Sequence, residues 1–271
     1  MKKIKPLIKI TFILFAFFII FQKIDLNEIK QLKLQNPLFL ILAFILFNLS
    51  QIISALRIHN YLKDINVTPS FKKQLMLYYV GMFYNTLLPG GIGGDAYKAY
   101  KFEKSYKQGY KKIIKALLID RISGLFGILF LIGILISFSS FNFYFVTLLT
   151  FSPILLFLLH KFFLKEFRFS PFFYSVLIQS LQGLAFLSII LSLGIKEHLI
   201  DFIILFFISS IISVIPVSVG GVGLRELTFL YGLEYLHLNP TIGVVSAFLF
   251  FVISVISSAI GALFLKGVKY V

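Results

Sequence analysis

Asn85-Thr86-Leu87-Leu88-Pro89-Gly90-Gly91-Ile92-Gly93-Gly94-Asp95 interrupts one apolar stretch of the chain, and Pro216-Val217-Ser218-Val219-Gly220-Gly221 interrupts another. Both contain the pattern Pro-x-x-x-Gly-Gly, and the two prolines lie 127 residues apart. Each pattern ends an apolar run, 74–88 or 201–215, which forms only about 22 Å of α-helix and is too short to cross about 30 Å of hydrocarbon. Paired interruptions of this kind are typical of transporters that bind substrate near the middle of the membrane.

The composition of the chain is that of a membrane protein. Its 271 residues are 59% hydrophobic and 14% charged, with a mean hydropathy of +0.95, whereas soluble domains have roughly 45–50% apolar and about 25% charged residues. Soluble enzyme folds are therefore excluded, because too few polar residues could cover such an interior. The absence of cysteine excludes disulfides, thiolate metal sites and cysteine nucleophiles. The net charge of +15 indicates orientation against an anionic membrane surface, and no nucleic-acid partner is expected.

Six further apolar runs are predicted to cross the bilayer as helices. A short first run, 7–21, follows three lysines, and we interpret it as a retained span because no small-x-small cleavage pattern follows it. The other five are clear and comprise residues 37–56, 113–138, 141–159, 171–194 and 241–265.

The distribution of lysine and arginine predicts the topology. If all eight apolar runs crossed the membrane from a cytoplasmic N-terminus, 11 Lys and Arg would lie inside and 14 outside, against the positive-inside rule. If both interrupted segments turn back within the membrane, the count becomes 20 inside and 5 outside; if only the first does, it is 19 and 6. The charges therefore support the first hairpin, whereas the second hairpin depends on the internal symmetry. The alternative that the second segment crosses the membrane completely stays open.

The expected fold class is an all-α polytopic integral membrane protein with about six transmembrane helices and two re-entrant hairpins, at about 74–97 and 201–226. The chain 1–271 is predicted to be a single membrane domain whose halves, roughly 1–138 and 139–271, form an inverted repeat. We expect it to be a multi-pass protein of the cell (inner, cytoplasmic) membrane with both termini in the cytoplasm.

Ionisable residues inside or beside apolar runs are candidates for binding a substrate, because each costs a few kcal/mol near the bilayer centre. Two interpretations of Arg121 stay open. It and Asp120 are a solvated pair near the cytoplasmic end of their run, or the Arg121 guanidinium faces the bundle interior and holds a lipid phosphate. The candidates are Asp95, Lys98, Arg121, Arg225 and Glu226.

The glycines of the two segments are either points of flexibility and close packing or places where the backbone approaches a ligand. Asn85 either hydrogen-bonds a head group or satisfies carbonyl groups freed by Pro89. We expect Gly94 and Gly221 to be equivalent positions without room for a side chain, so that valine at either abolishes lipid movement. Gly133, in an ordinary span, is expected to tolerate valine unless it packs against a neighbouring helix. The glycines concerned are Gly90, Gly91, Gly93, Gly94, Gly220, Gly221 and Gly223.

These motifs, with Asp120-Arg121 between them and Leu224-Arg225-Glu226 after the second, resemble the flippase-like transmembrane domain of lysylphosphatidylglycerol synthases, which also occurs alone in many bacterial and archaeal membrane proteins. Where the family often has Arg three residues after the Gly-Gly-Asp aspartate, this chain has Lys98, which keeps the charge but not the bidentate fork. The predicted substrate-binding residues are Asn85, Pro89, Gly90, Gly93, Gly94, Asp95, Lys98, Arg121, Pro216, Gly220, Gly221, Gly223, Arg225 and Glu226.

The resemblance also concerns activity. Full-length family members carry a soluble aminoacyl-transfer domain that uses charged tRNA, and these 271 residues leave no room for it, so synthase activity is not expected. The four histidines show no ligand spacing, and no nucleophile–base pair or Walker-type loop occurs. We therefore expect no catalytic residues, no metal and no cofactor.

The function predicted is that of a lipid flippase or flippase-like transporter, which moves a phospholipid or polyprenyl-phosphate-linked lipid between leaflets. One alternative is a membrane enzyme that modifies a lipid head group with Asp95 and Glu226 as acid and base. Another is a non-transporting subunit of a lipid or glycan pathway. The expected partners are membrane lipids and a lipid- or glycan-synthesising enzyme. The lipid substrate, the direction and energy source of transport and the oligomeric state stay open.

Overall fold

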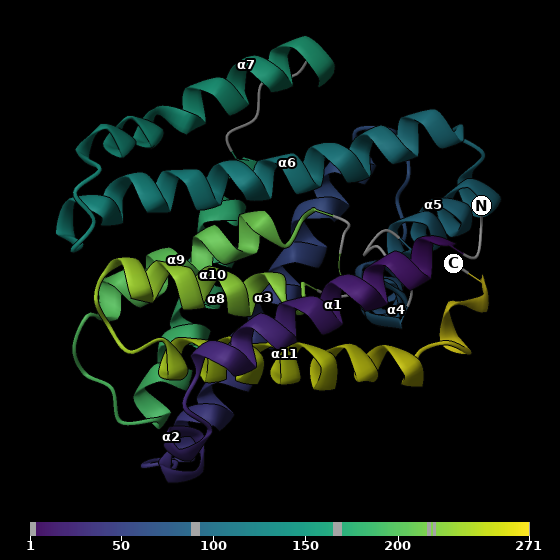
Figure 1. The fold of residues 1–271 in the computed structure, drawn as a ribbon. Helices are drawn as coiled ribbons and strands as arrows, with labels where there is room; N and C mark the ends of the chain where they lie inside the picture. Colours follow the sequence, from purple (N-terminus) through teal and green to yellow (C-terminus); the bar gives the residue numbers. More distant parts are fainter. Residues whose placement is uncertain (1–3, 88–92, 165–169, 216–217, 219–220, 271) are drawn as a thin grey trace.

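The computed structural model describes residues 4–87, 93–164, 170–215, 218 and 221–270. Within these ranges the chain is helical and contains no β-strand (Figure 1). The α-helices and short 3₁₀-helices (η) are α1 (Ile4–Lys23), α2 (Leu26–Gln31), α3 (Leu38–Lys63), α4 (Phe71–Leu87), α5 (Gly93–Tyr106), α6 (Tyr110–Leu135), η1 (Ile136–Phe138), η2 (Tyr144–Phe151), α7 (Ser152–Leu164), α8 (Ser170–Ser192), α9 (Leu199–Ile212), α10 (Leu224–Tyr235), α11 (Pro240–Leu263) and η3 (Gly267–Tyr270).

Five helical segments are long and apolar enough to cross a membrane: α3, α6 with η1, η2 with α7, α8 and α11. They coincide with the five clear predicted spans, which confirms the all-α polytopic membrane fold. The sixth predicted span corresponds to α1, of which Thr11–Lys23 is a shorter apolar helix. The span predicted to end at residue 56 continues to Lys63, because Ile58 and Leu62 keep one face of α3 buried.

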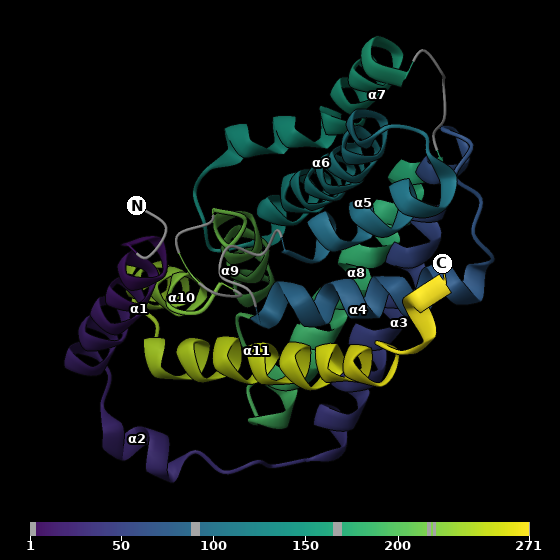
Figure 2. The same cartoon turned by 90° about the vertical axis from the view of Figure 1, so that its right-hand side faces the viewer.

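The first interrupted segment forms a helical hairpin. Near the turn Asn85 of α4 contacts Gly94 of α5, and further from it Tyr78 contacts Lys98, so α5 runs back along α4. Figure 2 shows the two short helices next to each other. The start of α4 and the end of α5 therefore lie at the same end of this hairpin.

The second interrupted segment forms an equivalent hairpin. Ser210 of α9 contacts Arg225 of α10 near the turn, and Leu205 contacts Gly232 further away, so these helices are also antiparallel. In Figure 1 the chain enters α9 and leaves α10 at the same side of the molecule. α1 begins and α11 ends at the opposite side in this view, as an even number of crossings requires.

The order of helix lengths repeats along the chain. A long helix, two short helices and a long helix follow one another as α3–α4–α5–α6 and again as α8–α9–α10–α11. Equivalent helices begin 132, 128, 131 and 130 residues apart. α6 and α11 run in opposite directions in Figure 1. An inverted duplication requires both the repeated order of helix lengths and the opposite directions of equivalent helices. The duplication itself stays a prediction.

Buried apolar residues form two clusters, one for each hairpin. The larger contains Phe186 of α8, whose ring centroid lies 4.7 Å from that of Phe206 in α9 and 5.1 Å from that of Phe229 in α10. The smaller contains Leu77 of α4 and Phe102 of α5. Between the hairpins α3 and α8 cross, and their contact is the most extensive among the described helices. Each hairpin is thus anchored by its own apolar core.

Gly133 of α6 does not face open space. A Cβ added to it would lie 2.6 Å from the backbone nitrogen of Thr150 in η2, which is closer than real Cβ contacts. Gly133 thus packs against a neighbouring helix, which is the case in which valine is not expected to be tolerated. Gly133→Val would separate α6 from η2, and Gly133 is not a neutral control position.

Candidate functional site

The two helices of the first hairpin, α4 and α5, are held together by close contacts. Asn85 Oδ1 accepts a hydrogen bond from the backbone N–H of Gly94 at 2.7 Å. A Cβ added to Gly94 would overlap the carbonyl oxygen of Gly81, so the two limbs touch backbone to backbone. The φ angle of Gly94 is not positive, and its need for glycine comes from packing. Asn85 therefore joins the limbs, and a contact between Asn85 and a head group stays a prediction.

Asp95, in the first turn of α5, lies between two cations. Its Oδ1 is 2.6 Å from Nζ of Lys98, and its Oδ2 is 2.5 Å from Nε of Arg121 on α6. The side chains of Asp95 and Lys98 are largely buried, whereas that of Arg121 is 43% exposed. This cluster joins the first hairpin to α6 and carries one net positive charge, which its arginine presents on the accessible side.

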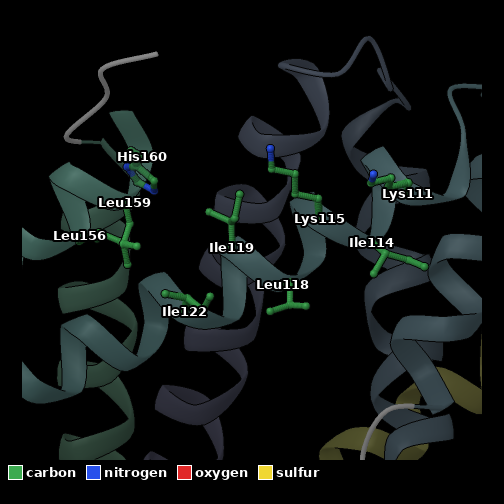
Figure 3. A pocket seen from close by; sticks show the side chains of 9 residues that line it. All are labelled: Lys111, Ile114, Lys115, Leu118, Ile119, Ile122, Leu156, Leu159 and His160. Carbon is green, nitrogen blue, oxygen red and sulfur yellow. The ribbon is translucent and has the colours of Figure 1, made fainter. Parts of the chain in front are cut away.

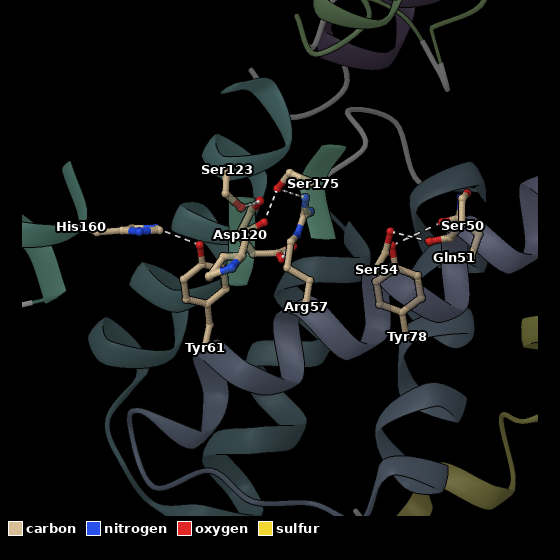
Figure 4. A network of polar contacts seen from close by, with 11 residues as sticks. Ser50, Gln51, Ser54, Arg57, Tyr61, Tyr78, Asp120, Ser123, His160 and Ser175 are labelled. Atoms are coloured by element: carbon tan, nitrogen blue, oxygen red, sulfur yellow. Dashed lines mark hydrogen bonds and ion pairs between the residues drawn. The ribbon is translucent and has the colours of Figure 1, made fainter. Parts of the chain in front are cut away.

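Asp120 has a different partner from its neighbour Arg121. Asp120 Oδ1 accepts a hydrogen bond from Nε of Arg57 on α3 at 2.7 Å, and Nη1 of Arg57 donates to Oγ of Ser175 on α8 at 2.8 Å (Figure 4). The interpretation of Asp120 and Arg121 as one solvated pair is therefore not supported. Each residue instead ties α6 to another helix.

Arg57 is the residue that sequence reasoning missed, because it directly follows the predicted span 37–56. It is only 6% exposed and lies in a buried polar network. In the same network the hydroxyl of Tyr61 lies 2.9 Å from Nε2 of His160, which connects α3 to α7 (Figure 4). The signal was present in the chain, since Ile58, Tyr61 and Leu62 continue the apolar helical spacing past Arg57.

The second hairpin begins its returning helix with two glycines at positive φ, +83° at Gly221 and +85° at Gly223. The backbone N–H of Gly223 donates to Oε2 of Glu226 at 2.7 Å, and Glu226 is fully buried. The Glu226 carboxylate is thus positioned to cap the start of α10, where the helix dipole stabilises a negative charge. A direct contact between Glu226 and a substrate stays a prediction.

Arg225, one residue earlier, occupies a different environment. Its Nη1 donates to Oγ of Ser210 at 3.1 Å, and its guanidinium carbon lies 5.9 Å and 5.6 Å from the ring centroids of Phe206 and Phe250. Among the residues that the structure describes, no salt bridge joins Arg225 to a carboxylate, including its neighbour Glu226. Arg225 is therefore a cation beside two aromatic rings that forms no salt bridge with a carboxylate in the described part of the chain.

Three arginines meet around one cavity of about 560 Å³ between α3, α6, α8, α9 and α10. The lining consists of Arg57, Arg121 and Arg225 together with Gln179, Gln182, Ser210 and apolar residues of α6 and α9. We call this space the arginine cavity. A second cavity of about 360 Å³ contains Asp95 and shares Arg121 with the first. Guanidinium groups bind phosphate and carboxylate oxygens with paired donors, so the larger cavity suits an anionic group.

Four predicted substrate-binding positions, Pro89, Gly90, Pro216 and Gly220, lie outside the described residues, as does the hairpin glycine Gly91. The structure brings Arg121 and Arg225 to one cavity, whereas Asn85, Gly94 and Glu226 hold the hairpins together. In the described ranges no three His, Asp or Glu residues are grouped so that they could hold a metal ion.

Comparison with known proteins agrees with this architecture. A family model described as "Lysylphosphatidylglycerol synthase TM region" matches residues 7–170 and 165–261. The chain is also 33% identical over 98 residues to "UPF0104 membrane protein PH1989" from Pyrococcus horikoshii, an alignment that covers 35% of this chain and 29% of that relative. No solved structure matches. The chain therefore belongs to the family of lysylphosphatidylglycerol synthase transmembrane regions.

Proposed function

We propose that the protein moves a lipid with an anionic head group, a phospholipid or a polyprenyl-phosphate-linked lipid, between the two leaflets of the membrane. The observation that carries the proposal is Arg225, which lines the arginine cavity and forms no salt bridge with a carboxylate among the described residues. A cation in a membrane interior is costly unless an anion or water compensates it. A lipid phosphate entering the cavity would supply that anion.

The surroundings of Arg225 favour this ligand. The guanidinium lies beside the rings of Phe206 and Phe250, and Ser210 accepts a hydrogen bond from one of its nitrogens. Arg121 faces the same cavity from α6, so two guanidinium groups from different elements line one space. Gln179 adds a largely buried Oε1 that has no hydrogen-bond partner in the described structure, an acceptor for a head-group hydroxyl or amine.

The two hairpins support transport over chemistry. Ser210 and Arg225 of the second hairpin line the arginine cavity, and Asp95 of the first hairpin lines the smaller cavity that shares Arg121 with it. Paired hairpins from the two halves of a chain are used for alternating access. The enzyme alternative requires Asp95 and Glu226 as acid and base. Asp95 is engaged by two cations, and Glu226 is fully buried at its own helix start, so neither is available for proton transfer to a head group.

The test uses purified protein in phosphatidylcholine vesicles that contain a trace of phosphatidylglycerol with a fluorescent nitrobenzoxadiazole label. Dithionite bleaches the label in the outer leaflet only, so transfer from the inner leaflet appears as a second decay. We expect the decay with wild-type protein and its loss in Arg225→Gln, whereas Lys196→Gln, in the loop before α9, should retain it. Mass spectrometry of the recovered lipid completes the test. A changed lipid mass would support the enzyme alternative. The absence of both leaflet transfer and a mass change would contradict the proposal.

A further inference from the structure

α7 stands apart from the rest of the bundle (Figures 1 and 2). Only 17% of the span Tyr144–Phe162 is buried, against 44% for Tyr110–Phe138. Near its start, Oγ of Ser152 donates to the carbonyl of Phe126 at 3.1 Å, and near its end His160 contacts Tyr61 of α3. α7 thus contacts other helices near both of its ends, and a space lies between α6 and α7.

That space is an apolar cleft of about 520 Å³. Ile119 and Ile122 of α6 line one side of it, and Leu156 and Leu159 of α7 line the other (Figure 3). Such a lining offers hydrogen-bonding groups only at its rim and suits a hydrocarbon chain. For a cleft at the outer edge of a membrane domain, the hydrocarbon at hand is a lipid acyl chain.

One end of the cleft is cationic. Lys111, Ile114, Lys115 and Leu118 follow one another at helical spacing and form a single exposed stripe on α6. Figure 3 shows the two lysines at the rim near the start of the helix. Lysines beside the membrane surface attract anionic lipid, so charge complementarity indicates which lipid occupies the cleft.

The stripe leads to the arginine cavity. Leu118 lines the cleft, the cavity that contains Asp95 and the cavity that contains Arg225, and it is the one described residue that lines all three. Arg121 lies six residues beyond Lys115, about 9 Å along the helix axis. A head group could therefore pass from the lysines to Arg121 while its acyl chain stays in the cleft.

We infer that the cleft between α6 and α7 binds one acyl chain of an anionic phospholipid, with the head group at Lys111 and Lys115, and that Leu118 forms the boundary over which the head group enters the arginine cavity. The binding step stands on the cleft itself, and the passage over Leu118 rests on the proposed function.

The test exploits the absence of tryptophan from the chain. Leu118→Trp places a single fluorophore at the boundary, Leu159→Trp places one on the α7 wall, and Leu184→Trp, at a similarly exposed position on α8, is the matched control. Each variant is reconstituted in phosphatidylcholine vesicles containing increasing amounts of phosphatidylglycerol or phosphatidylcholine with brominated acyl chains. Bromine quenches tryptophan only at short range.

We expect Leu118→Trp and Leu159→Trp to reach half-maximal quenching at about fivefold less brominated phosphatidylglycerol than phosphatidylcholine for each contributing lysine. Leu184→Trp should be quenched equally by both lipids. Adding Lys111→Gln and Lys115→Gln should remove the preference. Equal quenching by the two lipids at both Leu118→Trp and Leu159→Trp would overturn the inference.

The same vesicles separate this inference from the proposed function. Adding Arg225→Gln should stop leaflet transfer but leave the preferential quenching of Leu118→Trp unchanged. Transfer by the wild-type protein without preferential quenching would refute the cleft alone. Preferential quenching without transfer would refute the proposed function alone.

Discussion

The two hairpins share the pattern Pro-x-x-x-Gly-Gly but differ in how their charges are arranged. In the first, Asp95 compensates Lys98 and Arg121 within one ion cluster. In the second, Glu226 holds the start of its own helix, and Arg225 has no salt bridge among the described residues. The first hairpin is therefore bound electrostatically to α6, whereas the second presents a cation to the cavity.

The glycines differ in the same way. Gly94 is required because its limb touches the backbone of Gly81, and Gly221 is required because its φ of +83° disfavours any side chain. One short motif thus forms a tight joint in one half of the chain and leads to a helix that begins beside a cavity in the other.

The largest effect is expected from valine at Gly94. The new side chain would overlap Gly81, which costs about 3 kcal/mol or more of stability. At Gly221 the backbone strain costs about 1–2 kcal/mol. Both variants should lose leaflet transfer, but only Gly94→Val should also yield markedly less folded protein by size-exclusion chromatography in detergent.

Gly267→Ala is the matched control, since a Cβ there would meet nothing closer than Sδ of Met76 at 3.6 Å. Normal transfer by Gly94→Val and Gly221→Val would show that neither turn contributes to transport.

The second prediction compares the loss of one charge from each hairpin. The two substitutions, Asp95→Asn and Arg225→Gln, should change the melting temperature differently. Asp95→Asn breaks an ion cluster that is only partly buried and should cost about 2 kcal/mol, or about 4–8 °C in melting temperature. Arg225→Gln removes a cation without a salt bridge and should leave the melting temperature unchanged or raise it. Circular dichroism on heating measures both, and equal destabilisation by the two variants would contradict the comparison.

The third effect concerns Arg121 and is smaller. Lysine keeps the charge beside Asp95, so Arg121→Lys should change stability little, but it lacks the bidentate fork. We expect leaflet transfer of labelled phosphatidylglycerol to slow by about tenfold, which corresponds to about 1.4 kcal/mol in the transition state. Full transfer by a normally folded Arg121→Lys protein would remove Arg121 from the binding site.

The smallest effect lies outside both hairpins and serves as a reference. Hydrogen bonds from Asn239 and Thr241 lower the pKa of Glu28 below its ordinary value of 4.5. The contact therefore stabilises the fold fully above pH 4.5 and is lost as pH falls through the lowered pKa. Glu28→Gln should slightly lower the melting temperature at neutral pH, and this effect should disappear once the pH has fallen below the lowered pKa. A difference that grows in acid would refute this assignment.

Much of the fold could be predicted from the sequence, because the lengths of apolar runs and the positions of proline and glycine depend on local properties. The five long spans and the two hairpins are of this kind. The Arg57–Asp120 pair could not be predicted, since it joins residues 63 positions apart on different helices. For the same reason the packing of Gly133 against η2 and the different partners of Asp120 and Arg121 emerged only from the three-dimensional arrangement.

The central claim is that the hairpins enter the membrane from opposite faces, and cysteine accessibility tests it most directly because the native chain contains no cysteine. Single cysteines are placed in the first turn of α4 and after α5, at Lys72 and Lys107, and before α9 and after α10, at Glu197 and His237. Cells are treated with a membrane-impermeant maleimide before and after permeabilisation. We predict that the first pair reacts only after permeabilisation and the second pair reacts in intact cells. Labelling of Glu197→Cys and His237→Cys from opposite faces would make α9–α10 a full crossing and contradict the account.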